Sequence, residues 1–289
     1  MSGHNKWSQI KRKKGINDSA KGKIYTKISK QIIQAVKQNG SDDPESNFAL
    51  KMAISSAREA DMPMDNVKSA ILKASDKSQK NTLESIVYEA YSYGNSSLLI
   101  ECLTDNRNRT VANIREIIEK GGGGKLVPSN SILWKFAIVG YISLLSETKE
   151  EHEQYEKKLK SMSIRNIDTS NEKRKLQSGN HEFIDSFMLE LLDVEGIIDI
   201  KEENVVDEDR GEDGVFSIDI YTLDKSLASI RKLIDEKYKF EIETSKLIYL
   251  ANEQIHLEQV QVEKLQNLIL SLEEDDDVIS CYTDVSNIW

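Results

Sequence analysis

Cysteine and histidine are scarce in this sequence, and long apolar stretches are missing from it. The 289 residues include two cysteines and four histidines. No histidine has a second ligand at the spacing of a zinc site, so we expect no metal and no cofactor. Cys102 and Cys281 lie in apolar, strand-like segments, which predicts buried, reduced thiols and no disulfide. No apolar run approaches the roughly 20 residues that span a membrane, so we expect a cytoplasmic protein with no membrane partner.

Acidic residues are almost missing from residues 1–40. Ten lysines and arginines face a single acid there, Asp18, which gives this stretch a net charge of +9. The whole chain has a formal charge of −10, so the remainder carries −19. Such segregation indicates a polyanionic partner, although a basic tail that only keeps the protein soluble is the alternative. Trp7, inside the basic run, either stacks on a base or anchors the run to the domain that follows.

Apolar periodicity predicts helices in the first part of the chain and strands after it. Residues 22–38, residues 44–60 and a stretch that Pro63 opens have apolar residues at helical spacing, with Pro44 in the first turn of the second helix. Strand-like segments then predict a hairpin over 85–93 and 97–104, a helix over 111–120 and a short strand over 131–136. The glycines at 121–124 lack the neighbours of a phosphate-binding loop, and we interpret them as a flexible helix end.

The second half of the chain contains a recognisable order of elements. From residue 138 to 249 the order is strand, helix, strand, strand, helix, strand, which is the ferredoxin-like pattern. A helix over 259–272 and a strand over 278–283 then return to complete the earlier unit. We therefore predict a mixed α+β fold with an N-terminal three-helix domain followed by two α/β domains, the ferredoxin-like one inserted into the other. The predicted domains are 1–81, 82–137 with 253–289, and 138–252, the last with a charged expansion at 147–182.

Few groups of side chains in this sequence could catalyse a reaction or bind an ion. No nucleophile has a recognisable partner base, so we expect that the protein is not an enzyme. The acidic block at 273–277 lacks the ligand spacing and bend glycine of a calcium loop, which favours a solvated turn. Arg107 and Arg109 occur where a strand leads into a helix that Asp105 or Asn108 could cap. Two arginines beside helix N-terminal amides could hold a phosphate. Alternatively, they pair with neighbouring acids and fix the loop.

Two stretches most specifically resemble a known family, and residues 57–71, with Met62-Pro63 and Asp65, also resemble it. The first has the pattern G-H-x-K-W-x-x-I-x-x-x-K from Gly3 to Lys14 and continues through residues 20–27; the second is the run E-C-L-T-D-N-R-N-R-T-V at residues 101–111. Both are similar to the YebC/PmpR family, which includes the mitochondrial translational activator of cytochrome c oxidase. The resemblance covers nearly the whole chain apart from 147–182 and implies a regulator of gene expression. Members are described as DNA-binding transcriptional regulators or as ribosome-associated translation factors.

These observations predict a non-enzymatic, nucleic-acid-binding regulator that acts on RNA at the ribosome. Ribosomal or transfer RNA is favoured because the sequence has no heptad element for dimerisation and no convincing helix-turn-helix; we expect a monomer. Duplex DNA with transcription regulation is the alternative, and an adaptor that binds proteins through its acidic domains is a third. The candidate nucleic-acid-binding residues are His4, Lys6, Trp7, Lys11, Arg12, Lys13, Lys14, Lys21, Lys23, Lys27, Arg107, Asn108 and Arg109.

Overall fold

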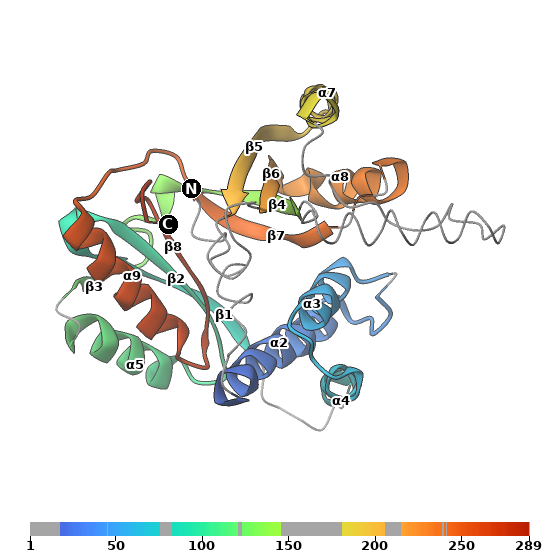
Figure 1. Cartoon of the computed structure of the whole chain (residues 1–289). Helices are drawn as coiled ribbons and strands as arrows, with labels where there is room; N and C mark the ends of the chain where they lie inside the picture. The colour runs from blue at the N-terminus through green and yellow to red at the C-terminus, as the bar shows by residue number, and fades with distance from the viewer. Residues whose placement is uncertain are drawn as a thin grey trace. The chain divides into compact units, whose positions relative to one another are not determined.

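The computed structural model describes residues 18–44, 46–75, 83–120, 123–145, 181–205, 215–238, 240 and 242–288. The chain divides into two compact units, one of Met1–Ala137 with Tyr249–Trp289 and one of Ile138–Ile248. Three helices are followed by two four-stranded sheets with their own helices, which confirms the predicted α+β class (Figure 1). The finer prediction, that residues 1–81 form a domain of their own, stays a prediction. None of the helices described is both long and apolar enough to cross a membrane.

The three N-terminal helices are α2 (Asp18–Asn39), α3 (Phe48–Glu59) and α4 (Met64–Ser75). Each buries one apolar stripe, as the spacing of three and four predicts. Small residues on α3 and α4 let the helices approach closely. The buried residues of this core are Ile28, Ile32, Ala35, Val36, Leu50, Ala53, Ile54, Ala57, Met62, Val67, Ala70 and Ala74.

The start of α3 differs from the prediction. Asn47, which is fully buried, accepts the backbone N–H of Leu50 at 3.1 Å and so caps the helix. Its side-chain amide donates to the carbonyls of Ala35 and Ser41, which ties the cap to the end of α2. Pro44 therefore lies in the connection before α3 and not in the first helical turn, because the cap delays the start of the helix.

The first sheet has the strand order β3-β1-β2-β8, and its described pairs are all antiparallel. Its elements are β1 (Glu84–Tyr91), β2 (Ser97–Thr104), α5 (Arg107–Lys120), β3 (Lys125–Val127), α9 (Gln259–Glu273) and β8 (Val278–Thr283). The hairpin of β1 and β2 is confirmed, with the short helix η1 (Tyr93–Asn95) at its turn. Helices α5 and α9 cover one face of the sheet, where Ile114 and Ile118 meet Leu265 and Ile269 in one core (Figure 1).

The segment between α5 and the second unit differs most from the prediction. The strand expected over 131–136 is a short helical turn, η2 (Leu133–Lys135), and the strand lies earlier, at β3. Gly123 and Gly124 have a packing role. A β-carbon at Gly123 would lie 2.4 Å from the Tyr93 ring, and one at Gly124 would lie 2.2 Å from the carbonyl oxygen of Tyr91. These glycines allow β3 to approach β1, so describing them only as a flexible helix end was incomplete.

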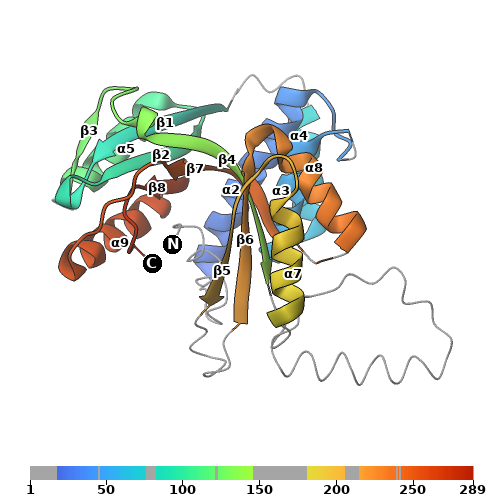
Figure 2. The ribbon, with the colours of Figure 1, turned by 90° about the horizontal axis from the view of Figure 1, so that it is seen from above.

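The second unit has the strand order β5-β6-β4-β7, the arrangement of a ferredoxin-like sheet. Its elements are β4 (Phe136–Leu145), α7 (His181–Leu192), β5 (Ile197–Val205), β6 (Val215–Leu223), η3 (Asp224–Ser226), α8 (Leu227–Leu233), η4 (Ile234–Tyr238) and β7 (Ile242–Ala251). Helices α7 and α8 lie on one face of this sheet (Figure 2). Phe187 packs there edge-on against Phe240, with ring centroids 4.9 Å apart. The charged expansion, apart from residues 181 and 182, lies outside the described residues.

Candidate nucleic-acid interface

A buried carboxylate, Asp277, joins three parts of the first unit. Its side chain is only 4% exposed and accepts from Lys30 of α2 at 2.6 Å through Oδ1. Its other oxygen, Oδ2, accepts from Arg109 at 2.8 Å and from Thr110 at 2.9 Å, both on α5. Thr104, the last residue of β2, completes the group at 3.2 Å. The carboxylate therefore connects the helical region to the α/β part of the same unit.

Two opposing effects act on the pKa of Asp277. Burial raises it, because a charged carboxylate loses its hydration inside the protein. Hydrogen bonds from Lys30, Arg109 and Thr110 outweigh this effect and lower the pKa to about 2. Asp277 is therefore ionised at neutral pH, and its charge balances Arg109, which the sequence predicts to bind nucleic acid, and Lys30 of the basic stretch.

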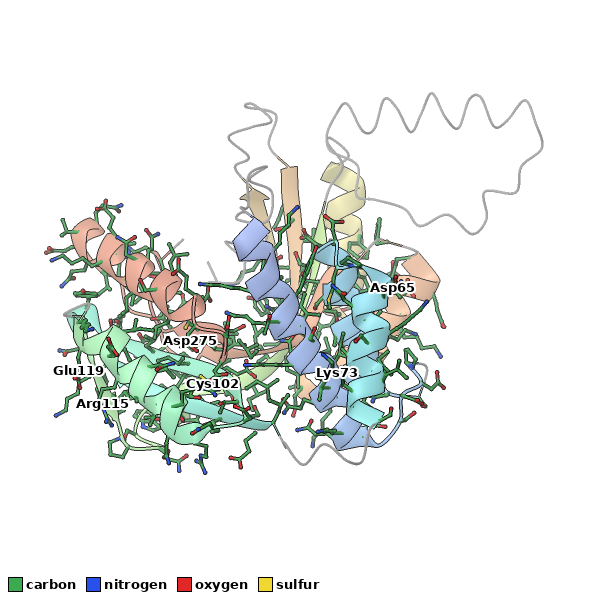
Figure 3. The ribbon with its side chains drawn as sticks, turned by 90° about the horizontal axis from the view of Figure 1, so that it is seen from below. Asp65, Lys73, Cys102, Arg115, Glu119 and Asp275 are labelled. Carbon is green, nitrogen blue, oxygen red and sulfur yellow. The ribbon has the colours of Figure 1, made fainter. Side chains whose placement is uncertain are left out.

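The acidic block at the end of α9 is not a fully solvated turn, contrary to the prediction. Lys27 of α2 donates to the backbone carbonyl of Glu273, in the last turn of α9, at 2.5 Å. Lys30 also donates to the carbonyl of Asp276, at 2.9 Å. These ammonium groups meet the negative end of the α9 dipole, where a cation is stabilising. Asp275 lies at the same end of α9 and accepts from Asn113 of α5 at 3.0 Å (Figure 3).

Helix α5 begins earlier than predicted, so both arginines lie in its first turn. Asn106 accepts the backbone N–H of Arg109 at 3.1 Å, which makes Asn106 the cap in place of Asp105 or Asn108. Arg109 donates to Asp277 and also to Asp105, at 2.9 Å; the contact with Asp277 first, and then that with Asp105, raises the pKa of its guanidinium. Arg107 differs, because its side chain is 67% exposed and its nearest acid, Glu84, is 3.8 Å away.

The predicted site residues thus fall into three groups. Lys27 and Arg109 are held by acceptors of the protein itself. Lys21 and Lys23, at the start of α2, are exposed, as are Arg107 and Asn108. The rest lie outside the described residues, and their role stays a prediction: His4, Lys6, Trp7, Lys11, Arg12, Lys13 and Lys14.

The partners of Asp277 were not predicted from the sequence. Lys30 was counted in the basic stretch, but its contact with a residue 247 positions away was not foreseen. One available signal was the spacing of Lys27 and Lys30, which places both on one side of α2, off its apolar stripe. Thr104 and Thr110, within the motif at 101–111, donate to the same carboxylate, so this motif is at least partly structural.

Metal-binding arrangements are missing from the described residues, where no three His, Cys, Asp or Glu side chains are grouped to hold an ion. Cys102 and Cys281 are buried, as expected, and lie in neighbouring strands of the first sheet without a bond to each other. Burial raises the pKa of both thiols, which disfavours the reactive thiolate.

Comparison with known proteins identifies the class. The family model described as "TACO1/YebC protein N-terminal domain" matches residues 5–77, and "TACO1/YebC second and third domain" matches 83–178 and 170–285. The chain therefore belongs to the TACO1/YebC family.

The sequences of relatives and the fold of a solved structure are similar to this chain over nearly its whole length. A "probable transcriptional regulatory protein" of Syntrophomonas wolfei is 34% identical, over 99% of this chain and 96% of its own. The "probable transcriptional regulatory protein YrbC" of Bacillus subtilis is 31% identical, over 98% of each chain. The crystal structure of a conserved hypothetical protein, Aq1575, from Aquifex aeolicus shares the fold, with a TM-score of 0.70 and 24% identity over 97% of this chain and 96% of its own.

Proposed function

We propose that this protein is a non-enzymatic regulator of gene expression that binds nucleic acid through its basic N-terminal segment and the adjoining start of α2. The main support for nucleic-acid binding by this segment is the charge distribution along the chain. Residues 1–40 hold +9, and the rest of the chain holds −19 and repels a polyanion at long range. Salt screening limits the interaction between exposed charges to a range of about 8 Å at physiological salt. The lysines must therefore contact the phosphates directly.

Contacts within the protein argue against some of the candidate nucleic-acid-binding residues. Acceptors within the protein already bind three of the cations: Lys27, Lys30 and Arg109. A phosphate would have to displace Asp277 or the carbonyl at the end of α9 to bind them. Lys21 and Lys23 are exposed and make no ion pair in the described ranges. On α5, Arg107 and Asn108 remain available beside the helix N-terminus. The proposed contact set is therefore the N-terminal segment, Lys21, Lys23, Arg107 and Asn108.

We favour RNA at the ribosome as the target, with ribosomal or transfer RNA bound by a monomer. An acidic body with one basic segment suits an RNA site that admits the segment and excludes the body. No helix-turn-helix dimer that would set a half-site spacing is evident from the sequence. If the protein binds promoter duplexes and does not associate with ribosomes, DNA becomes the favoured target in place of RNA.

Transcription regulation is the second candidate, and two observations favour it. The relatives named above carry that function in their names. In addition, only Ala60, Asp61, Met62 and Pro63 connect α3 to α4, a length that occurs in helix-turn-helix motifs. Against it, Asp65 places a carboxylate in the first turn of α4, where a recognition helix would meet the duplex.

The test compares ribosome co-sedimentation with binding to duplex DNA at several matched salt concentrations. Replacing Lys11, Arg12, Lys13 and Lys14 by Ala should weaken binding to every nucleic acid and flatten the logarithmic salt slope by up to about 3. Unchanged affinity and slope would remove the basic segment from the mechanism.

A matched pair of variants tests the α5 contact. Arg107→Ala should reduce the salt slope by about 0.7 to 0.9, since one phosphate contact is lost. Arg115→Ala is the control, because Arg115 projects from the same helix and lies 4.0 Å from Glu119 (Figure 3). Equal slopes for the two variants would exclude Arg107 from the interface.

A further inference from the structure

The loop between β3 and β4 displays a tryptophan to solvent. Trp134, in η2, is 71% exposed, the largest value for a large apolar residue in the described part of the chain. Tryptophan carries a large apolar ring, and leaving it in water forgoes the stabilisation that burial would give. The loop nevertheless holds this residue outside the core.

A buried carboxylate fixes the backbone of this loop. Glu89 of β1 is 2% exposed and accepts three backbone N–H groups, from Asn130 at 2.5 Å, Ile132 at 2.7 Å and Leu133 at 2.9 Å. Burying a charge is costly unless such donors surround it. The loop therefore has one strongly preferred conformation, with Ile132 as its fully buried anchor.

Further contacts fix the tryptophan itself. The indole Nε1 donates to the carbonyl of Ser131 at 2.9 Å, and the carbonyl of Trp134 accepts from Asn252 at 3.2 Å. Next in the chain, Lys135 donates to Ser97 at 2.8 Å. The one polar atom of the ring thus donates its hydrogen bond within the loop. The π face of the ring therefore remains for contact with a ligand.

Most of the exposed residues around Trp134 in this loop are polar, although Pro128 is exposed and Leu133 is half-buried. Ser129 and Asn130 are exposed, and no second large apolar side chain of the loop is exposed. The core of a protein–protein interface needs a cluster of apolar residues, whereas stacking on a base needs one accessible ring with polar surroundings. Lys125 of β3 is exposed and lies opposite Tyr91. The ammonium of Lys135, the residue after Trp134, lies 5.5 Å from the centre of the Tyr91 ring, so Lys125 is the candidate cation for the backbone of a bound strand.

We propose that Trp134 is a stacking platform for an unpaired base of single-stranded nucleic acid. This inference rests on the proposed function and extends it, because the basic segment gives affinity for phosphates of any kind while the ring requires a base that is free of its duplex. The platform therefore adds a preference for single strands or loops over continuous duplexes.

Affinity measurements test the platform. With a 20-nucleotide oligo(U) strand as the probe, Trp134→Ala should bind about 5- to 150-fold more weakly than the unmodified protein, with an unchanged salt slope. Trp134→Phe should recover part of this loss, since its ring still stacks. Leu72→Ala is the matched control, because Leu72 is 70% exposed on α4. A duplex of the same length should show no such loss.

Fluorescence provides a second readout. The chain has three tryptophans, at positions 7, 134 and 289. In the variant with Trp7→Phe and Trp289→Phe, emission comes from Trp134 alone and should be quenched when saturating oligo(U) binds. Oligo(dT) as a second probe reports whether the platform also accepts DNA.

The outcomes separate this proposal from the preceding one. If Trp134→Ala binds as the unmodified protein does while the four-alanine variant at 11–14 is weakened, the platform is wrong and the proposed function stands. If Trp134→Ala is weakened and the four-alanine variant is not, the platform stands without the basic segment. If Trp134 emission does not change at saturation, the ring does not stack and the platform is excluded.

Discussion

Two buried carboxylates of the first unit, Asp277 and Glu89, are stabilised in different ways. Asp277 accepts from side chains of α2, β2 and α5, and two of these carry positive charge. Glu89 accepts from backbone N–H groups of one loop. Glu89 alternates with Ala90, which faces α5 and α9, so its side chain lies on the opposite face of the sheet. The comparison shows that one carboxylate connects distant segments, whereas the other shapes a single loop.

The largest expected effect comes from removing the connecting carboxylate. Asp277→Ala leaves Lys30 and Arg109 without their acceptor and should lower the free energy of unfolding by about 3 kcal/mol, measured by urea denaturation. Asp276→Ala is the control, because its carboxylate is exposed and its change should stay below about 0.5 kcal/mol. Similar losses for both variants would show that the network does not stabilise the unit.

A smaller effect is expected from Glu89→Gln. Glutamine keeps one acceptor oxygen but presents an amide N–H₂ to donors of the loop, so the free energy of unfolding should fall by about 2 kcal/mol. Hydrogen exchange at the amides of Asn130, Ile132 and Leu133 should accelerate, whereas the helical region should be unaffected. Glu119→Gln, at an exposed position of α5, is the control (Figure 3). Unchanged exchange in the loop would contradict the role assigned to Glu89.

The smallest effect is a dependence on pH. The pKa of Asp277 is about 2 in the folded protein and 3.8 for an ordinary aspartate, so the lowered folded pKa stabilises the ionised form. This contribution, about 1–2 kcal/mol, is complete above about pH 4 and is lost as the pH falls from 4 to 2. The difference in stability between the unmodified protein and Asp277→Asn should shrink over that range. A constant difference would show that Asp277 does not titrate with this pKa.

Local patterns predicted most of the elements. Apolar residues three and four apart identified α2, α3 and α4, and alternating strand-like segments identified the hairpin of β1 and β2. These signals lie within the elements themselves, so packing against other parts of the chain only reinforces them. The boundaries were less predictable, because the caps Asn47 and Asn106 moved the starts of α3 and α5.

Contacts between distant residues explain the remaining differences. Residues 131–136 have the composition of a strand, but Glu89, more than 40 positions earlier, binds their backbone N–H groups and holds them in a turn. Lys27 and Lys30 have the composition of a nucleic-acid surface, yet acceptors at 273–277 occupy them. A basic stretch shows how many cations are present but not which of them are already neutralised.

The position of β8 has a consequence for the nascent chain. This strand, Val278–Thr283, pairs with β2 of the hairpin and follows the turn that carries Asp277. Until Asp277 leaves the ribosome, Lys30 lacks its carboxylate, and until β8 follows, β2 lacks its second neighbour in the sheet. All strands of the second unit precede this point in the chain, so that unit can fold first. Pairing β8 with β2 closes a loop that contains the whole second unit, and closing it costs conformational entropy. Completion of the first unit is therefore a late step of biogenesis.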